Sequence, residues 1–375
     1  MELRRCVQAA VATLDSRDLL VVLDDSSPEQ SRSSQSWLAD IALTSPARIC
    51  HVGAQRAHIE VSRSLGNGDL EWQRKTSARD ISPLRNLSLL FSASIQPTTT
   101  VLIDDDISAF RLDCTHQICD DLEAAPDGLI AGAAIGNLTD LDTLTKLSAA
   151  VRYVTKAGIA DPTADIFRGS SGDADEVSFE ACMSAGYMAF RLPTSRLFAF
   201  PPGYNEDWLW CLLQRGMGKI RIVRMEQEVR HDPFLLRAPT RDGIHFETLG
   251  DVVFDCLSEC SGYGRWLLPE LALKALQEFT PDKSSLPATR AAALVEQLLD
   301  LTPEQRARAL GSLSDRGLVL FQKMLDAGEL EIGDGRSLLC SWSHDALIKH
   351  LSFGATIANP RVISRVRQIL EMEEK

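Results

Sequence analysis

Two short apolar runs, each ending in consecutive acidic residues, constrain the fold more than any other feature of the sequence. The runs LLVVLDD and VLIDDD place these acids at Asp24, Asp25, Asp104, Asp105 and Asp106. Short apolar runs bounded by polar turns are typical of buried strands. Because ligand sites in α/β domains lie at the carboxyl ends of strands, these aspartates are candidate functional residues.

The segments around these two runs alternate between helical and extended patterns. An apolar face at helical spacing predicts helices over residues 2–13 and 82–95. Ser27-Pro28-Glu29-Gln30 has the pattern of a helix N-cap with proline in the first turn. Further strands are expected at residues 19–23, 101–103, 128–136, 184–192 and 219–225, and a long loop at 64–82. The pattern predicts a mixed α/β domain over residues 1–240.

The chain changes character at about Thr240. Residues 241–375 contain amphipathic segments such as ALVEQLL, LVLFQKML and RVISRVRQILEMEEK, which predict a helical C-terminal module. No motif in this module indicates chemistry. We therefore expect it to serve packing, assembly of a homo-oligomer or the shaping of an acceptor site.

Composition excludes several classes of partner and compartment. The formal net charge of −13 argues against a nucleic-acid scaffold or an anionic membrane surface as the main partner. The nine cysteines are odd in number and show no disulfide framework, as in a reducing compartment. No apolar run is long enough for a membrane span, and no signal-peptide pattern opens the chain. We expect a cytoplasmic protein without a transmembrane segment.

Asp104, Asp105 and Asp106 are the first candidate site. In an extended segment the first and third side chains point the same way, so two carboxylates converge on one point. Without a cation between them, one of the two would take up a proton. Oxygen ligands of this kind suit Mg²⁺ or Mn²⁺. A solvated acidic turn after a strand is the alternative reading of so short a motif.

A second acidic pair, Glu206 and Asp207, lies in the segment PPGYNEDWLWCLLQRG. Asn205 is the expected N-cap of a helix that these acids begin. Acids in the first helical turn stabilise the helix through its dipole, by about 0.3–1 kcal/mol. The functional reading is a general base that takes a proton from a hydroxyl. Spacing alone leaves both readings open.

Three weaker motifs complete the set of candidates. Arg85-Asn86 opens a predicted helix and offers a cation and an amide to a nucleotide, although a solvated helix start has the same pattern. His231 is a candidate metal ligand, although a packing or surface role is the commoner one for histidine. The segment CTHQIC has no fourth ligand at zinc-site spacing, which argues against a zinc site.

Taken in chain order, these segments resemble the GT-A glycosyltransferases, particularly the group typified by family 2. That group shows a helix of the form ELRRCLESL, a strand closing in VVDDGS, an Arg-Asn pair opening a helix, a strand ending in DxD, a glycine-containing strand and a Glu-Asp pair before a helix. The corresponding segments are ELRRCVQAAVAT, LLVVLDDSS, LRNLSLLFSA, VLIDDDI, SAGYMAFRLP and GYNEDWLWCLLQRG, within residues 2–234. The resemblance implies a GT-A mixed sheet flanked by helices.

The resemblance also implies an activity, which is metal-dependent transfer of a sugar from a nucleotide-diphospho-sugar donor to the hydroxyl of an acceptor. Mn²⁺ or Mg²⁺ is the implied cofactor. The residues implied to contact the donor or its sugar are Asp24, Asp25, Arg85, Asn86, Asp104, Asp105, Gly186 and Tyr187. Of these, Asp25 is expected at the nucleotide base.

The metal and catalytic roles fall on fewer residues. By resemblance, Asp104 and Asp106 hold the cation together with the donor, and His231 is a further metal ligand. Asp207 matches the aspartate that acts as the base in inverting members. Glu206, beside it, is implied to contact the acceptor or the sugar.

One departure from the family pattern concerns the start of the sequence. The segments begin at the family's first helix, so its opening strand with a Tyr-Asn turn is expected either to lie upstream of Met1 or to be missing. A missing strand favours a second reading, a catalytically inactive GT-A-fold binding protein. A third reading is a haloacid-dehalogenase-type phosphatase, because Asp104, Asp106 and Ser108 fit a DxDx[TS] pattern.

Overall fold

The protein is described from a computed structural model. Its described residues are 2–66, 70–77, 79–105, 107, 119–120, 122–124, 129–135, 144, 147, 151, 184–191, 197–218, 221–229, 240–258, 281–304, 316–331 and 335–373.

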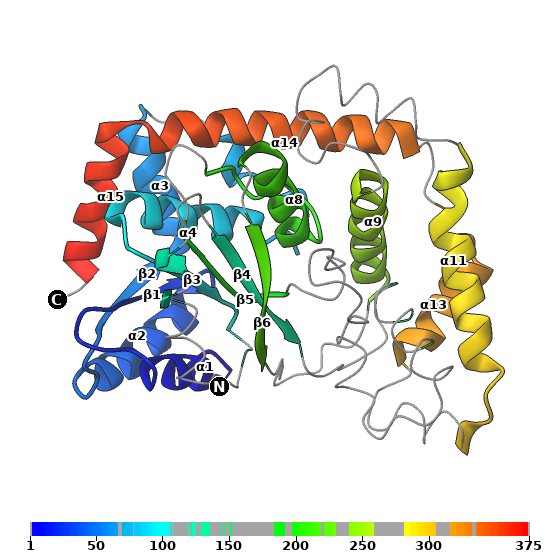
Figure 1. The fold of residues 1–375 in the computed structure, drawn as a ribbon, viewed down its shortest axis with the longest axis horizontal. Helices are drawn as coiled ribbons and strands as arrows, with labels where there is room; N and C mark the ends of the chain where they lie inside the picture. Colours follow the sequence, from blue (N-terminus) through cyan, green and yellow to red (C-terminus); the bar gives the residue numbers. More distant parts are fainter. Residues whose placement is uncertain are drawn as a thin grey trace.

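The described part of the chain is a mixed α/β structure, as the sequence predicted (Figure 1). Its strands are β1 (Leu19–Asp24), β2 (Arg48–Gly53), β3 (Thr100–Ile103), β4 (Leu129–Ile135), β5 (Ser184–Arg191) and β6 (Arg221–Val229). Its helices are α1 (Glu2–Val11), α2 (Pro28–Ala42), α3 (Ala54–Ser64), the 3-10 helix η1 (Glu71–Gln73), α4 (Ser82–Ile95), α8 (Glu206–Gly218), α9 (Arg241–Ser258), α11 (Pro281–Leu299), α13 (Arg316–Asp326), α14 (Gly335–Ile357) and α15 (Pro360–Glu373).

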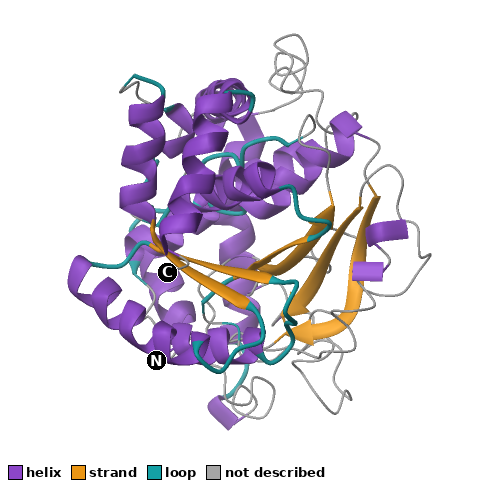
Figure 2. Cartoon of the chain, turned by 90° about the vertical axis from the view of Figure 1, so that its left-hand side faces the viewer, coloured by secondary structure: helices purple, strands orange, loops and turns teal. Residues whose placement is uncertain are grey.

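The described strands form two sheets. In the smaller sheet β1 and β2 run parallel, with Asp24 opposite Gly53. The larger sheet has the order β3-β5-β4-β6, in which β5 runs antiparallel to both neighbours and β6 runs parallel to β4. Figure 2 shows the two groups of strands with helices packed beside them. Asp24 and Asp104 lie at the carboxyl ends of β1 and β3, as the sequence predicted.

Local chemistry explains where α2 and α4 begin. Ser27 caps α2, because its hydroxyl accepts from Gln30 N while Gln30 Oε1 accepts from Ser27 N, which confirms the predicted capping box. Pro83 lies in the first turn of α4, where a missing backbone N–H costs no helical hydrogen bond. Gln96 ends α4 in the left-handed conformation, with φ 57°.

One hydrophobic core joins the first third of the chain to its last helices. It contains Val52 of β2, Leu90 of α4 and Phe190 of β5 together with Phe353 of α14 and Ile369 of α15. In Figure 1, α14 runs along the top of the molecule between α11 and α15. A second cluster joins α11, α13 and the start of α9. The boundary at 240/241 therefore stays a prediction, and helices on both sides of it share the first core.

Several elements differ from the sequence prediction. No element was predicted at β2 or α3, and α14 lies in the predicted helical module without having been predicted individually. The apolar residues of α14 are spread around the helix rather than along one face. The predicted loop 64–82 contains η1, whose Trp72 is fully buried and donates from Nε1 to Thr356 Oγ1. The predicted strand 219–225 is described from Arg221 and extends to Val229.

Candidate functional site

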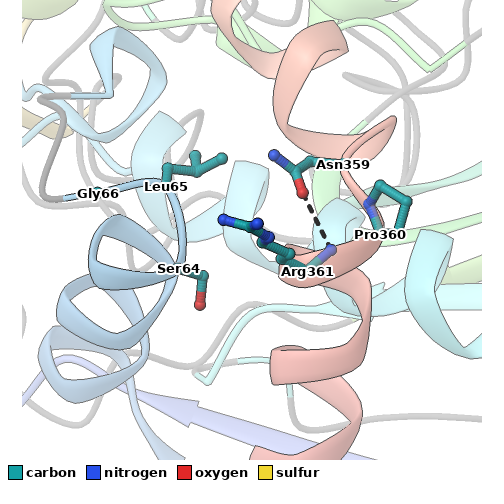
Figure 3. A pocket seen from close by; sticks show the side chains of 6 residues that line it. All are labelled: Ser64, Leu65, Gly66, Asn359, Pro360 and Arg361. Carbon is teal, nitrogen blue, oxygen red and sulfur yellow. Dashed lines mark hydrogen bonds between the residues drawn. The ribbon is translucent and has the colours of Figure 1, made fainter.

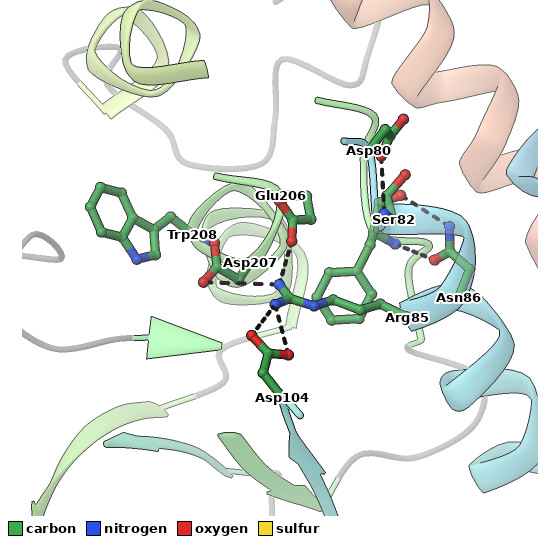
Figure 4. A network of polar contacts seen from close by, with 9 residues as sticks. Asp80, Ser82, Arg85, Asn86, Asp104, Glu206, Asp207 and Trp208 are labelled. Carbon is green, nitrogen blue, oxygen red and sulfur yellow. Dashed lines mark hydrogen bonds and ion pairs between the residues drawn. The ribbon is translucent and has the colours of Figure 1, made fainter. Parts of the chain in front are cut away.

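Arg85 lies at the centre of three carboxyl groups that come from distant segments. It occupies the first turn of α4 and is 8% exposed. Its Nη2 donates to both carboxylate oxygens of Asp104, at 3.3 and 3.2 Å, and its Nη1 donates to Glu206 Oε1. Asp207 Oδ2 lies 4.0 Å from the same Nη1 (Figure 4). The structure thus places residues of three predicted motifs, the Arg-Asn pair, the VLIDDD strand and the Glu-Asp pair, next to one another.

The backbone around β3 fixes the position of Asp104. Asp104 N donates to the carbonyl of Gly186 on the neighbouring strand β5, at 3.0 Å. The Cys6 Sγ of α1 donates to the carbonyl of Asp104, at 3.2 Å. Tyr187 is the partner of Ile103 across the sheet and is buried. Of the two predicted sugar-site residues, Gly186 therefore supports Asp104, and Tyr187 is part of the packed interior.

Glu206 and Asp207 begin α8 and are held there by Asn205. Asn205 has φ 59°, a conformation that asparagine tolerates better than most residues. Its carbonyl accepts from Leu209 N at 2.9 Å, the first helical bond. Its side-chain amide donates to Asp251 Oδ1 of α9, at 2.7 Å. The sequence predicted Asn205 as an N-cap, and the structure adds that its side chain ties α8 to α9.

Burial and charge act in opposite directions on the groups of this cluster. Burial alone would lower the pKa of Arg85, but the carboxylates of Glu206, Asp104 and Asp207 raise it above its ordinary value. Burial raises the pKa of Glu206 from 4.5 to about 8, with Arg85 opposing and Asp207 adding to the rise. Glu206 therefore holds a proton to higher pH than an ordinary glutamate does, whereas Arg85 keeps its charge.

Asn86, next to Arg85, is fully buried and faces the backbone of other segments. Its Oδ1 accepts from Phe200 N at 2.5 Å, and its Nδ2 donates to the carbonyls of Phe200 and Trp72, at 3.2 and 3.4 Å. The Phe200 ring lies under the guanidinium of Arg85, 5.8 Å from its carbon to the ring centroid. Asn86 therefore bonds to the backbone of the segments that surround Arg85. Its predicted contact with a donor stays a prediction.

Asp24 and Asp25 form a second polar group at the end of β1. Asp24 accepts from the backbone and hydroxyl of Ser26 and lies 2.9 Å from His51 Nε2 of β2. Burial opposes ionisation of Asp24, but the bonds from Ser26 and His51 hold its pKa below the ordinary value. Asp25 accepts from Lys75 Nζ at 2.8 Å, in a half-exposed ion pair. Both aspartates are thus charged groups at a strand end, as expected of a ligand site.

The metal ligands predicted from the sequence are only partly described. The Asp104 side chain is 38% exposed, and Asp105 is exposed beside it. Four candidate residues lie outside the described part, namely Asp106, His231, Cys114 and His116. Among the described residues, no group of three or more His, Cys, Asp or Glu side chains is arranged to hold a metal ion. The metal site therefore stays a prediction.

Sequence reasoning missed four residues that support these groups. They are His51 beside Asp24, Asp251 beside Asn205, and the buried pair Asp80 and Lys349 near the start of α4. His51, Asp251 and Lys349 contact residues 27, 46 and 269 positions away, so no local motif marks them, whereas Asp80 also accepts from the nearby Thr76 and Ser82. The only sequence signal was the polar His51 within the apolar run RICHVG.

A surface cavity of about 420 Å³ lies away from these residues (Figure 3). It is lined by Ser64, Leu65 and Gly66 after α3 and by Asn359, Pro360 and Arg361 at the start of α15. Asn359 Oδ1 accepts from Arg361 N at 3.0 Å and so caps α15. None of the candidate site residues lines this cavity.

Comparison with known proteins adds no relative. No protein-family model matches the chain, and no curated protein sequence matches it. In the part of the chain that the structure describes, no helix combines the length and the apolar character needed to cross a bilayer.

Proposed function

We propose that the chain is a metal-dependent glycosyltransferase of the GT-A fold, which moves a sugar from a nucleotide-diphospho-sugar to an acceptor hydroxyl. The cluster around Arg85 carries the proposal. The Arg-Asn pair, the end of the VLIDDD strand and the Glu-Asp pair are assigned to one donor site by the GT-A resemblance. Asp104, Glu206 and Asp207 of these motifs meet at the guanidinium of Arg85, although Arg85 and Glu206 are 121 residues apart.

The arrangement of the strands supports the GT-A part of the proposal. Each of the two sheets presents an aspartate at the carboxyl end of an apolar strand, Asp24 on β1 and Asp104 on β3. Strands of both sheets pack into one core, which includes Cys50 and Val52 of β2 and Met188 of β5. We therefore treat the two sheets as parts of one GT-A domain.

The two acids of the Glu-Asp pair take different roles in the proposed reaction. Burial raises the pKa of Glu206 to about 8, so Glu206 holds its proton more readily and is the less suited of the two to act as the base. Asp207 lies farther from Arg85 and has the more exposed side chain, 14% against 7% for Glu206. Asp207 is therefore the residue we assign to take the proton from the acceptor hydroxyl.

The oxygen ligands of the proposed cation are carboxylates, which suit a hard divalent ion. Asp104 and Asp207 bring two carboxylates to the single guanidinium of Arg85, and the Asp104 carboxylate is accessible from solvent. Asp104 and Asp106 would hold Mn²⁺ or Mg²⁺, which stabilises charge on a leaving nucleoside diphosphate when bound. Arg85 adds a fixed positive charge beside Asp104.

Binding of nucleotide-sugars to the purified protein tests the proposal. We expect one of UDP-, GDP-, dTDP- or CDP-sugars to raise the melting temperature in the presence of Mn²⁺ and not in its absence. A ligand at 100 times its dissociation constant stabilises a folded protein by about 2.7 kcal/mol. Asp104→Ala and Asp106→Ala should abolish this shift. The matched control is Asp40→Ala, which removes an exposed carboxylate on α2 and should retain it.

The same experiment separates the alternatives. Asp207→Asn should bind the donor as the wild type does but lose transfer if the enzyme inverts configuration, and full transfer by this variant excludes Asp207 as the base. Donor binding without turnover in the wild type indicates a binding protein on the same fold. Release of phosphate from a simple phosphoester, without nucleotide-sugar binding, indicates the phosphatase.

A further inference from the structure

Helix α14 carries a buried lysine that contacts the start of α4. The Lys349 side chain is 4% exposed, and its Nζ donates to Ser82 Oγ at 3.0 Å. Asp80 Oδ2 lies 3.8 Å from the same nitrogen, and Asp80 is fully buried. Burial lowers the pKa of Lys349, and Asp80 opposes that change. A buried ammonium group is stable only where such partners are in place.

Asp80 connects this lysine to the backbone that leads into α4. Its carboxylate accepts from the backbone and hydroxyl of Thr76, both at 2.9 Å, and from Ser82 N at 3.0 Å. Arg85 follows one turn later, and its backbone N–H donates to the carbonyl of Ile81 at 3.1 Å. Figure 4 shows Asp80 and Ser82 at the end of α4 from which Arg85 extends towards Asp104 and Glu206. The direction of Arg85 thus depends on a turn that Lys349 and Asp80 hold.

A second contact of α14 reaches the other side of the cluster. Trp342 Nε1 donates to the carbonyl of Pro202 at 3.0 Å, and both groups are buried. Pro202 lies four positions before Glu206 in the segment that leads into α8. Trp342 and Lys349 are seven residues apart and therefore lie on one face of α14. One helix face thus contacts both backbone segments whose side chains meet at Arg85.

We propose that Lys349 is a positioning residue for the donor site. Lys349, on α14, fixes the start of α4. This holds the Arg85 side chain between Asp104 and Glu206, where a bound donor would contact it. The inference rests on the proposed function for its reaction, but its geometric part concerns this chain alone. It gives the C-terminal helices a role at the donor site, whereas the sequence suggested packing, assembly or the shaping of an acceptor site.

The test measures Arg85 itself and needs no ligand. The guanidinium Nε–H of Arg85 gives an NMR signal that can be assigned by its loss in Arg85→Lys. We expect Lys349→Met to speed exchange of this proton with water by about tenfold or more, the ratio expected for loss of a buried hydrogen bond from a charged group. Ser82→Ala, which removes the acceptor and leaves the ammonium in place, should act in the same direction and serves if Lys349→Met does not fold.

Arg365→Met is the matched control. Arg365 of α15 donates from Nη2 to Glu60 Oε2 of α3, at 2.5 Å. It has no described contact with α4 or α8. Arg365→Met removes an ion pair between α15 and α3. The rate at which the Arg85 Nε–H proton exchanges with water should nevertheless stay within about twofold of the wild-type rate. Unchanged exchange in both Lys349→Met and Ser82→Ala overturns the inference.

Donor affinity separates this inference from the proposed function. If a nucleotide-sugar binds, Lys349→Met should weaken it about tenfold and Arg365→Met should not. If Lys349→Met speeds Arg85 exchange but no form of the protein binds any nucleotide-sugar, Lys349 still positions Arg85 and the glycosyltransferase proposal fails. If donors bind the wild type and Lys349→Met with equal affinity, the positioning role fails and the proposed function stands.

Discussion

Glu206 and Asp207 are neighbours in the chain, yet the fold gives their carboxyl groups different surroundings. Glu206 is 5% exposed and packs in the interior beside Arg85. The side chain of Asp207 is more exposed and lies farther from Arg85. The spacing of the motif left both acids open as candidates, and only the GT-A resemblance named Asp207 as the base. The difference in burial gives a physical reason for the same choice, and a local motif does not encode it because burial depends on segments 100 residues or more away.

The raised pKa of Glu206 predicts a pH dependence of stability. Between 4.5, its ordinary pKa, and about 8, its folded pKa, the folded protein holds a proton that the unfolded chain has released. The free energy of unfolding should therefore be highest below 4.5, as far as this group is concerned, and should fall as the pH rises through about 8. Glu206→Gln, which cannot titrate, should remove that part of the slope. Urea denaturation over this pH range measures it.

Glu331→Gln is the control for this measurement. Glu331 is exposed and follows α13, so its substitution should leave the wild-type slope in place. A Glu206→Gln protein with the same slope as the wild type shows that Glu206 is ionised in the folded state. In that case Glu206 and Asp207 both remain candidates for the base.

At the scale of elements, the sequence predicted those whose signals are local. The capping box at Ser27, the helix opened by Pro83 and the strand before Asp104 all depend on residues within one turn or one short run. Helix α14, which packs against α4, η1, α11 and α15, was not predicted individually, because polar Lys349 and Thr356 lie on its buried face whereas apolar Leu351 is 62% exposed. The apolar residues of such a helix show no clear periodicity, although one of its faces is buried.

The close approach of α9 to the turn before α8 gives a prediction at this scale. A Cβ added to Gly250 would lie 2.5 Å from the carbonyl oxygen of Tyr204 and 2.7 Å from its carbon, and this backbone cannot move without shifting Asn205. Gly250→Ala should therefore destabilise the fold by about 1–3 kcal/mol, as overpacking does, and loosen the bond between Asn205 and Asp251. Thermal and urea denaturation measure the change.

Gly354 provides the opposite case within α14. No atom lies within 4 Å of a Cβ added there, so Gly354→Ala meets no clash. Alanine loses less backbone entropy than glycine on folding, and this variant should be more stable by about 0.5–1 kcal/mol. If Gly250→Ala and Gly354→Ala changed the free energy of unfolding equally, the close packing of α9 against Tyr204 would be wrong.

At the scale of the whole molecule, the first core crosses the boundary that composition suggested at 240/241. Phe353, Val366 and Ile369 pack with Val52 and Leu90, and Cys50 Sγ donates to the carbonyl of Leu370. The predicted boundary follows a change in amino-acid composition where the chain becomes helical. Which segments unfold together depends instead on which side chains share a core. The C-terminal helices α14 and α15 are therefore expected to unfold together with the strands and with α4.

Ile369→Ala tests this cooperativity. Truncating a buried isoleucine costs about 2–5 kcal/mol, and hydrogen exchange should show that loss in β2 and α4 as well as in α15. Leu318→Ala in α13 is the matched control, because Leu318 is as deeply buried but belongs to the second cluster with α11. Its effect should appear first in α11 and α13. Loss of protection confined to α15 in Ile369→Ala would instead make residues 241–375 a separate module, and Lys349 would then lose the rigid helix from which it acts on Arg85.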